Sequence, residues 1–113
     1  MTVNELKAYG ANTDEGLGRC LNNESFYLRL VKMIPGDPNF QKLFTAMDAG
    51  DLDTAFAAAH SLKGSTGNLA LTPIHAPVVE LTELLRSKTL ADYAALTQAI
   101  RTARDELARI CEG

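Results

Sequence analysis

The chain has 113 residues, of which 46% are hydrophobic and 22% are charged, and its formal net charge is −3. This length suits one domain with its own core, and we expect a single domain over residues 1–113. The slight acidic excess, without any basic run, argues against nucleic-acid binding, and no apolar run approaches the ~18 residues of a membrane span.

The N-terminal sequence has no basic segment followed by an apolar stretch, so no secretory signal is visible and we expect a cytoplasmic protein. Met1 and the helix-capping residues near both ends favour a freestanding protein. Cys20 and Cys111 are too few for a disulfide framework, and neither has metal-ligand spacing to a histidine. We therefore expect two buried, reduced thiols.

Two short helices are predicted at the start of the chain. Thr2 and Glu5 have the spacing of a capping box, and Gly10 is a typical helix stop. Thr13, which is followed by acidic residues, predicts the start of a second helix that continues to Leu21.

Two apolar helical segments follow. Asn22 or Asn23 can cap the first segment, which Pro35 ends. Asp37 followed by Pro38 predicts a new helix start, and the pattern fits either one bent helix or two separate helices. The apolar residues that recur at helical spacing in the first segment are Phe26, Leu30, Val31, Met33 and Ile34. We assign to the core the cluster Met33, Phe40, Phe44 and Met47.

Asp51 predicts the start of the helix that carries the most distinctive residues. Successive residues of an α-helix turn by about 100°, so Gly64 lies roughly 40° and Gly67 roughly 20° from His60. Lys63 lies roughly 60° away on the same wheel, while the apolar residues point roughly 120° away, so His60 is expected in solvent. A glycine inside a helix costs about 1 kcal/mol relative to alanine. Two glycines beside one exposed histidine therefore predict a surface that another protein approaches closely.

Two further helices complete the chain. Thr72 and Pro73 predict a cap and a proline at the first helical position, whereas Pro77 would remove one helical hydrogen bond. We therefore expect this helix to begin irregularly and to become regular from Pro77. Thr89 and Asp92 open the last helix with a box-like pattern. Long amphipathic helices joined by short turns predict an all-α fold, namely an antiparallel up-and-down four-helix bundle with short additional N-terminal helices.

Residues 59–69 read AHSLKGSTGNL, and this segment resembles the signature of the histidine-containing phosphotransfer (HPt) domain family. The Gly-Asp-Leu-Asp sequence at residues 50–53 and the order of the helices agree with the resemblance. The resemblance implies that His60 carries a phosphoryl group between aspartates of response-regulator receiver domains. It also implies that the partner receiver supplies the acidic pocket and Mg²⁺, so that this chain needs no metal or cofactor of its own.

The residue chemistry agrees with such a role. A neutral imidazole is nucleophilic at cytoplasmic pH and can hold a phosphoryl group covalently, and we assign this role to His60. Lys63, one turn away, supplies positive charge near the phosphate oxygens. Four residues are assigned to the surface on which the partner docks: Ala57, Ser61, Gly64 and Gly67. Two residues of the next helix are candidates for orienting the histidine ring: Thr82 and Glu83. We expect His75 to be a structural residue at a helix start.

Other functions were weighed against phosphotransfer. The phosphoacceptor domain of a sensor kinase generally has an acidic residue directly after its histidine, whereas Ser61 stands here and no ATP-binding domain follows. A non-catalytic helical adaptor that binds a receiver domain is the main alternative, but such a module would have no need to keep His60. With only two histidines and no paired carboxylates, a hydrolytic or metal-dependent enzyme has little support.

The expected protein is therefore a phosphoryl carrier, not an enzyme, that depends on receiver domains or a hybrid sensor kinase for turnover. We expect no nucleic-acid or membrane partner. A monomer is predicted because the sequence shows no strong second apolar seam on which a partner helix would pack.

Overall fold

The computed structural model describes residues 1–88 and 93–112, and these residues form seven helices and no strand. The helices are α1 (Val3–Tyr9), α2 (Thr13–Arg19), α3 (Glu24–Met33), α4 (Pro38–Ala49), α5 (Leu52–Asn68), α6 (Thr72–Arg86) and α7 (Tyr93–Glu112). The prediction of an all-α fold is confirmed. The capping pattern predicted at Thr89 and Asp92 lies outside the described residues.

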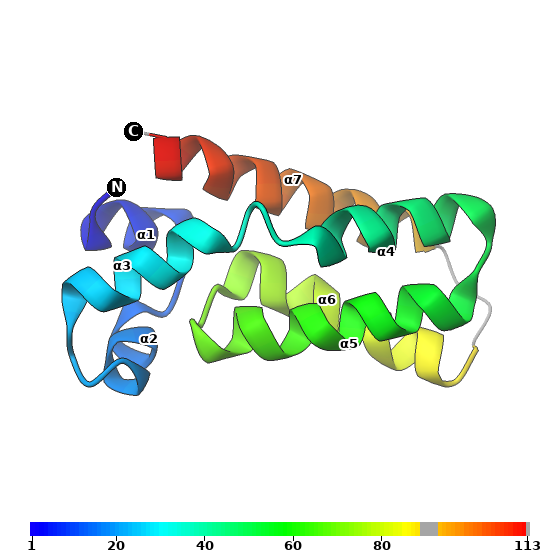
Figure 1. The fold of residues 1–113 in the computed structure, drawn as a ribbon, viewed down its shortest axis with the longest axis horizontal. Coiled ribbons are helices and arrows are strands. Elements are labelled where there is room, and N and C mark those ends of the chain that lie inside the picture. Colours follow the sequence, from blue (N-terminus) through cyan, green and yellow to red (C-terminus); the bar gives the residue numbers. More distant parts are fainter. Residues whose placement is uncertain (89–92, 113) are drawn as a thin grey trace.

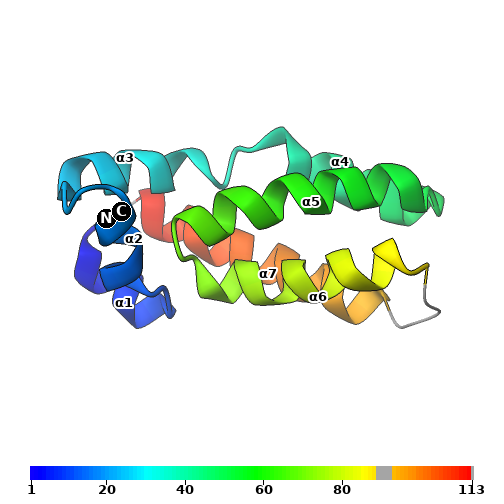
Figure 2. The same cartoon turned by 90° about the horizontal axis from the view of Figure 1, so that it is seen from below.

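The helices α4 to α7 run along the long axis of the molecule, and each reverses the direction of the one before it (Figure 1). Helix α5 packs against α4 and α6, α6 packs against α7, and α4 also contacts α7. The short helices α1 to α3 lie at one end, where the two termini also meet (Figure 2). Fully buried side chains from all four long helices form the core, among them Phe40, Leu43, Leu62, Leu81, Ile100 and Leu107.

The start of the long helix α5 follows the sequence signals. Gly50 ends α4 in the left-handed conformation, with φ +71°, which costs a glycine little. Asp51 then caps α5, and its carboxylate accepts hydrogen bonds from the Thr54 amide at 3.2 Å and the Thr54 hydroxyl at 2.6 Å. These hydrogen bonds lower the pKa of Asp51. The predicted helix boundary is confirmed.

The boundaries of α2 differ from the prediction. Asn12, not Thr13, is the cap, and its side chain accepts a hydrogen bond from the Glu15 amide at 3.2 Å. Thr13 is instead a buried residue of the first turn. The helix ends at Arg19 rather than Leu21, because Leu21 adopts a left-handed backbone with φ +58°. The two glycines in this short helix have low helix propensity and therefore favour an early end.

Helix α6 is regular from its first residue, so the predicted irregular start is wrong. The cap position is Leu71, which makes no side-chain cap, and Thr72 is already helical. Pro77 lies inside the helix. It removes only one backbone hydrogen bond, and the buried side chains on both sides of it hold the helix against the core. These side chains are Ile74, Val78, Leu81 and Leu85.

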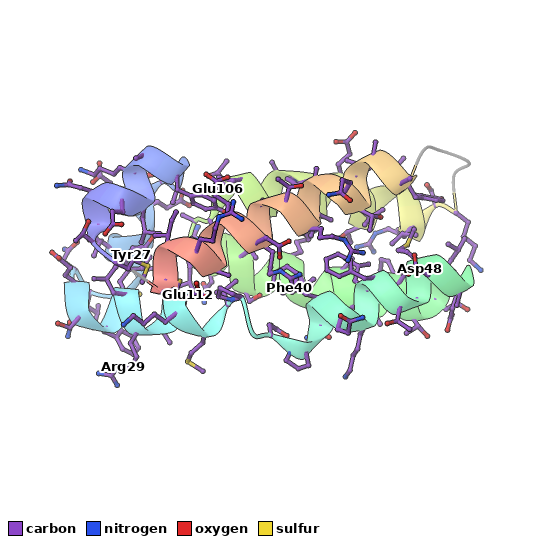
Figure 3. The ribbon with its side chains drawn as sticks, turned by 90° about the horizontal axis from the view of Figure 1, so that it is seen from above. Tyr27, Arg29, Phe40, Asp48, Glu106 and Glu112 are labelled. Carbon is purple, nitrogen blue, oxygen red and sulfur yellow. The ribbon has the colours of Figure 1, made fainter. Side chains whose placement is uncertain are left out.

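Helix α3 buries only part of the apolar stripe that was predicted for it. Tyr27, Val31 and Ile34 are buried, and the Tyr27 hydroxyl donates to the Leu69 carbonyl at 3.0 Å. Met33 is 66% exposed, so its assignment to the core is wrong, and Phe26 is 41% exposed. The reason is that the apolar arc of α3 is wider than the part of the helix that packs at the end of the molecule. In Figure 3, Tyr27 lies on the inner side of α3 and Arg29 points outward.

The two cysteines are free, as expected, but only Cys20 is buried. Cys111 is partly exposed near the C-terminal end of α7, with its Sγ 3.8 Å from the Met1 Sδ, so the prediction of two buried thiols is half wrong. Partial burial raises the pKa of Cys111. Among the described residues, no helix is long and apolar enough to span a bilayer.

Candidate functional site

His60 lies near the middle of α5, on its exposed side. The same helix buries Ala55, Ala59 and Leu62 towards its neighbours. Because these small and apolar residues fix the rotation of the helix, the imidazole ring faces solvent, as the helical wheel predicted. No hydrogen bond joins the ring to any residue that the structure describes.

Phe56 is the nearest ring to His60. The two residues are one turn apart, and their rings are stacked with centroids 5.9 Å apart and an interplanar angle of 26°. The guanidinium of Arg86, from the end of α6, lies 5.2 Å from the centre of the Phe56 ring. Neither residue was predicted from the sequence to belong to the site. For Phe56 the signal was its position four residues before His60, whereas Arg86 joins the site only through the packing of α6 on α5.

Lys63 lies one turn after His60, and its ammonium is 3.8 Å from a carboxylate oxygen of Glu83. Glu83 also pairs with Arg86, at 3.6 Å. All three side chains are at least a third exposed. Exposed ion pairs contribute between about 0 and 1 kcal/mol, so Lys63 can leave Glu83 for a stronger anion at little cost.

The two residues predicted to orient the histidine ring do not contact it. Thr82 is fully buried, and its hydroxyl donates to the Val78 carbonyl at 2.6 Å, which corrects that assignment. Glu83 does lie beside the site, but it holds Lys63 and Arg86 instead of a ring nitrogen of His60. Glu83 therefore affects the electrostatics of the site and does not orient the His60 ring.

The two glycines of the signature have different surroundings. A Cβ atom added at Gly64 would meet nothing within 4 Å, and Gly64 is exposed. At Gly67 a Cβ atom would lie 2.7 Å from Cε1 of His75. Gly67 therefore has a packing reason inside the molecule, so its being a glycine does not by itself indicate a docking surface, whereas Gly64 stays available to a partner.

His75 holds α6 against the end of α5. The Thr66 hydroxyl donates to the Leu62 carbonyl at 2.7 Å and lies 3.1 Å from Nδ1 of His75. The hydrogen bond between Thr66 and His75 therefore joins α5 to α6. Burial lowers the pKa of His75, and the nearby charges of Lys63 and Arg19 lower it further. His75 is thus a structural residue as expected, although it lies within α6 and not at its cap.

Ala57 and Ser61 are exposed on α5 beside His60 and Gly64. We call these four residues the α5 strip. Three of the four have small side chains or none, so a partner surface can come close to the imidazole ring. Within the described part of the chain, no group of three or more His, Cys, Asp or Glu residues could hold a metal ion.

The structure is an all-α domain that presents one histidine to solvent, with a lysine one turn away and bare backbone beside it. Comparison with protein families identifies the family. The model described as the Hpt domain matches residues 37–111, and the chain belongs to this family. No curated protein and no solved structure matched the chain.

Hpt domains take part in phosphotransfer in two-component systems and interact with receiver domains or kinases. The matched segment contains α4 to α7 and therefore the whole site around His60. Helices α1 to α3 lie outside it.

Proposed function

We propose that this chain is a phosphoryl carrier in which His60 accepts the group from the aspartate of one receiver domain and passes it to the aspartate of another. One observation supports the proposal most strongly: His60 faces solvent in the middle of a packed helix, with open space at Gly64. A donor and an acceptor must both reach the same ring, and the α5 strip leaves room for each in turn.

The transfer needs little covalent chemistry from the protein. The lone pair of the unprotonated ring nitrogen attacks phosphorus, and a P–N bond forms while the P–O bond to the aspartate breaks. The bonding pair leaves with the aspartate oxygen as a carboxylate, and the ring loses its extra proton to water. The return step reverses these changes on a second aspartate. Mg²⁺ and the acidic pocket would come from the receiver domain, so this chain is a carrier and not an enzyme.

The neighbouring residues would stabilise the transferred charge and hold the ring. The Lys63 ammonium would exchange Glu83 for a phosphoryl oxygen, since an exposed ion pair is easily displaced by a doubly charged group. The stack on Phe56 restricts how the imidazole turns. We further propose that α4 to α7 form the up-and-down four-helix bundle, that the chain is monomeric, and that it works in the cytoplasm with its receiver partners.

The test is the transfer of radiolabel from phosphorylated receiver domains of the host. The chain should gain an acid-labile, base-stable label, and His60→Gln should abolish it while the far-UV helical signal stays unchanged. His75→Gln is the matched control, because it changes the only other histidine of the chain. Label that persists in His60→Gln would refute the site. Receiver binding without any labelling of the wild type would instead favour a non-catalytic adaptor.

A further inference from the structure

Helix α3 carries an apolar stripe of which two residues are exposed and one packs partly against the core. Phe26, Leu30 and Met33 recur at the i, i+4 and i+7 positions and lie beside the buried face of the helix. Single exposed apolar residues are common on protein surfaces and mean little. On this face Phe26 is 41% and Met33 66% exposed, whereas Leu30 is partly buried against the core.

The stripe opens into a groove of about 510 Å³ at the junction of α3 and α4. Its apolar lining includes Leu30, Met33, Pro38 and Leu69. The opposite wall comes from α5 and includes Ser65 and Asn68. A groove with apolar walls and a few polar groups at its edge can hold an apolar side chain of a partner.

The groove adjoins the surface around His60. Ser65 and Asn68 follow His60 by five and eight residues on the same helix, so they lie about 7.5 and 12 Å further along its axis. Exposed Ser61 and Gly64 lie between them and the histidine. Figure 2 shows the α3–α4 junction alongside the C-terminal half of α5. One partner on the α5 strip can therefore also reach the groove.

The size of the apolar stripe argues against a second copy of this chain as the occupant. Helix α3 has 10 residues and is about 15 Å long. Three side chains on it cannot supply the roughly 800 Å² per partner that a stable interface buries. Together with the α5 strip, the same stripe offers one partner a larger contact surface than either region alone.

We propose that Leu30, Met33 and the groove beside them form a second docking element for the receiver domain that exchanges phosphoryl groups with His60. An apolar side chain of that domain occupies the groove, while its active site faces the imidazole ring. This inference rests on the proposed function. Leu30 and Met33 lie outside the segment that the Hpt model matches, whereas Pro38, Ser65 and Asn68 of the same groove lie inside it. Methionine suits such a contact because its side chain adapts to the shape of a partner.

The test measures binding apart from chemistry. In a His60→Gln background, unphosphorylated receiver domains of the host are titrated by calorimetry, and the tightest binder is used for comparison. Met33→Asp should raise the dissociation constant about tenfold or more, because it places a charge where an apolar contact forms. Asn68→Arg, which obstructs the groove from the other helix, should weaken binding in the same direction. Both residues are exposed, so the melting temperature should change little.

Two matched controls accompany these variants. Leu21→Asp changes an apolar residue that is 91% exposed and does not line the groove, and it should alter the dissociation constant less than twofold. Met33→Leu should also bind normally. If Met33→Asp and Asn68→Arg bind as Leu21→Asp does, the docking element is refuted while transfer to wild-type His60 remains intact. A wild-type dimer that Met33→Asp dissolves would assign the groove to a second copy and overturn the proposal. Failure of wild-type transfer, with these binding differences preserved, would reject the proposed function and not the docking element.

Discussion

The two glycines of the signature should respond to alanine with opposite signs. At Gly64 an added Cβ meets open space, so alanine should stabilise the domain by up to about 1 kcal/mol through its better helix propensity. At Gly67 the same gain is opposed by a contact of 2.7 Å with the His75 ring. Moving that ring breaks its hydrogen bond to Thr66, at about 1 kcal/mol, and crowding costs about 1–3 kcal/mol more.

Gly67→Ala should therefore destabilise the domain by about 1–3 kcal/mol, and the two variants should differ by about 2–4 kcal/mol. Urea unfolding followed by circular dichroism measures both free energies of unfolding. The double variant Gly67→Ala/His75→Ala removes the clash and should be less destabilised than the sum of its two single variants. Equal stabilisation by alanine at Gly64 and Gly67 would refute the packing argument.

Two other predictions concern the histidines. The folded state lowers the pKa of His75, so below about pH 6.5 the unfolded chain binds a proton that the folded chain resists, and stability should decline as pH falls. Urea midpoints between pH 7.5 and 5 should show this decline for the wild type and a smaller one for His75→Gln. Phe56→Leu should slow label transfer to His60 several-fold because it removes the ring stack, whereas Phe56→Tyr should keep the rate, and transfer unaffected by Phe56→Leu would exclude a positioning role.

The parts of the fold that the sequence predicted correctly depend on neighbours along the chain. The cap at Asp51 forms with Thr54, three residues later, and therefore follows from local sequence. The outward direction of His60 follows from the apolar periodicity of its own helix. Both predictions needed no knowledge of how the helices pack.

The wrong predictions concern features that depend on how the helices pack against one another. The apolar arc of α3 is wide, so periodicity could not say which part of it, Val31 or Met33, faces the core. The place of Pro77 inside α6 depends on burial of the residues around it, which outweighs one missing hydrogen bond. The ion pairs of Glu83 and the position of Arg86 over Phe56 depend on the register between α5 and α6, for which the sequence contains no local signal.

The two glycines of the signature illustrate both cases, one that depends on local sequence and one that depends on packing between helices. Gly64 is exposed, and no contact inside the molecule requires a glycine there. Contact with a partner is therefore the remaining explanation for a glycine at this position. Gly67 is required by the His75 ring, which enters from the next helix. On a helical wheel the two positions look alike, because the wheel records direction from the axis and not what lies there. A glycine near a functional histidine therefore indicates a docking surface only when the space above it is empty, and here that condition holds at Gly64 alone of the two.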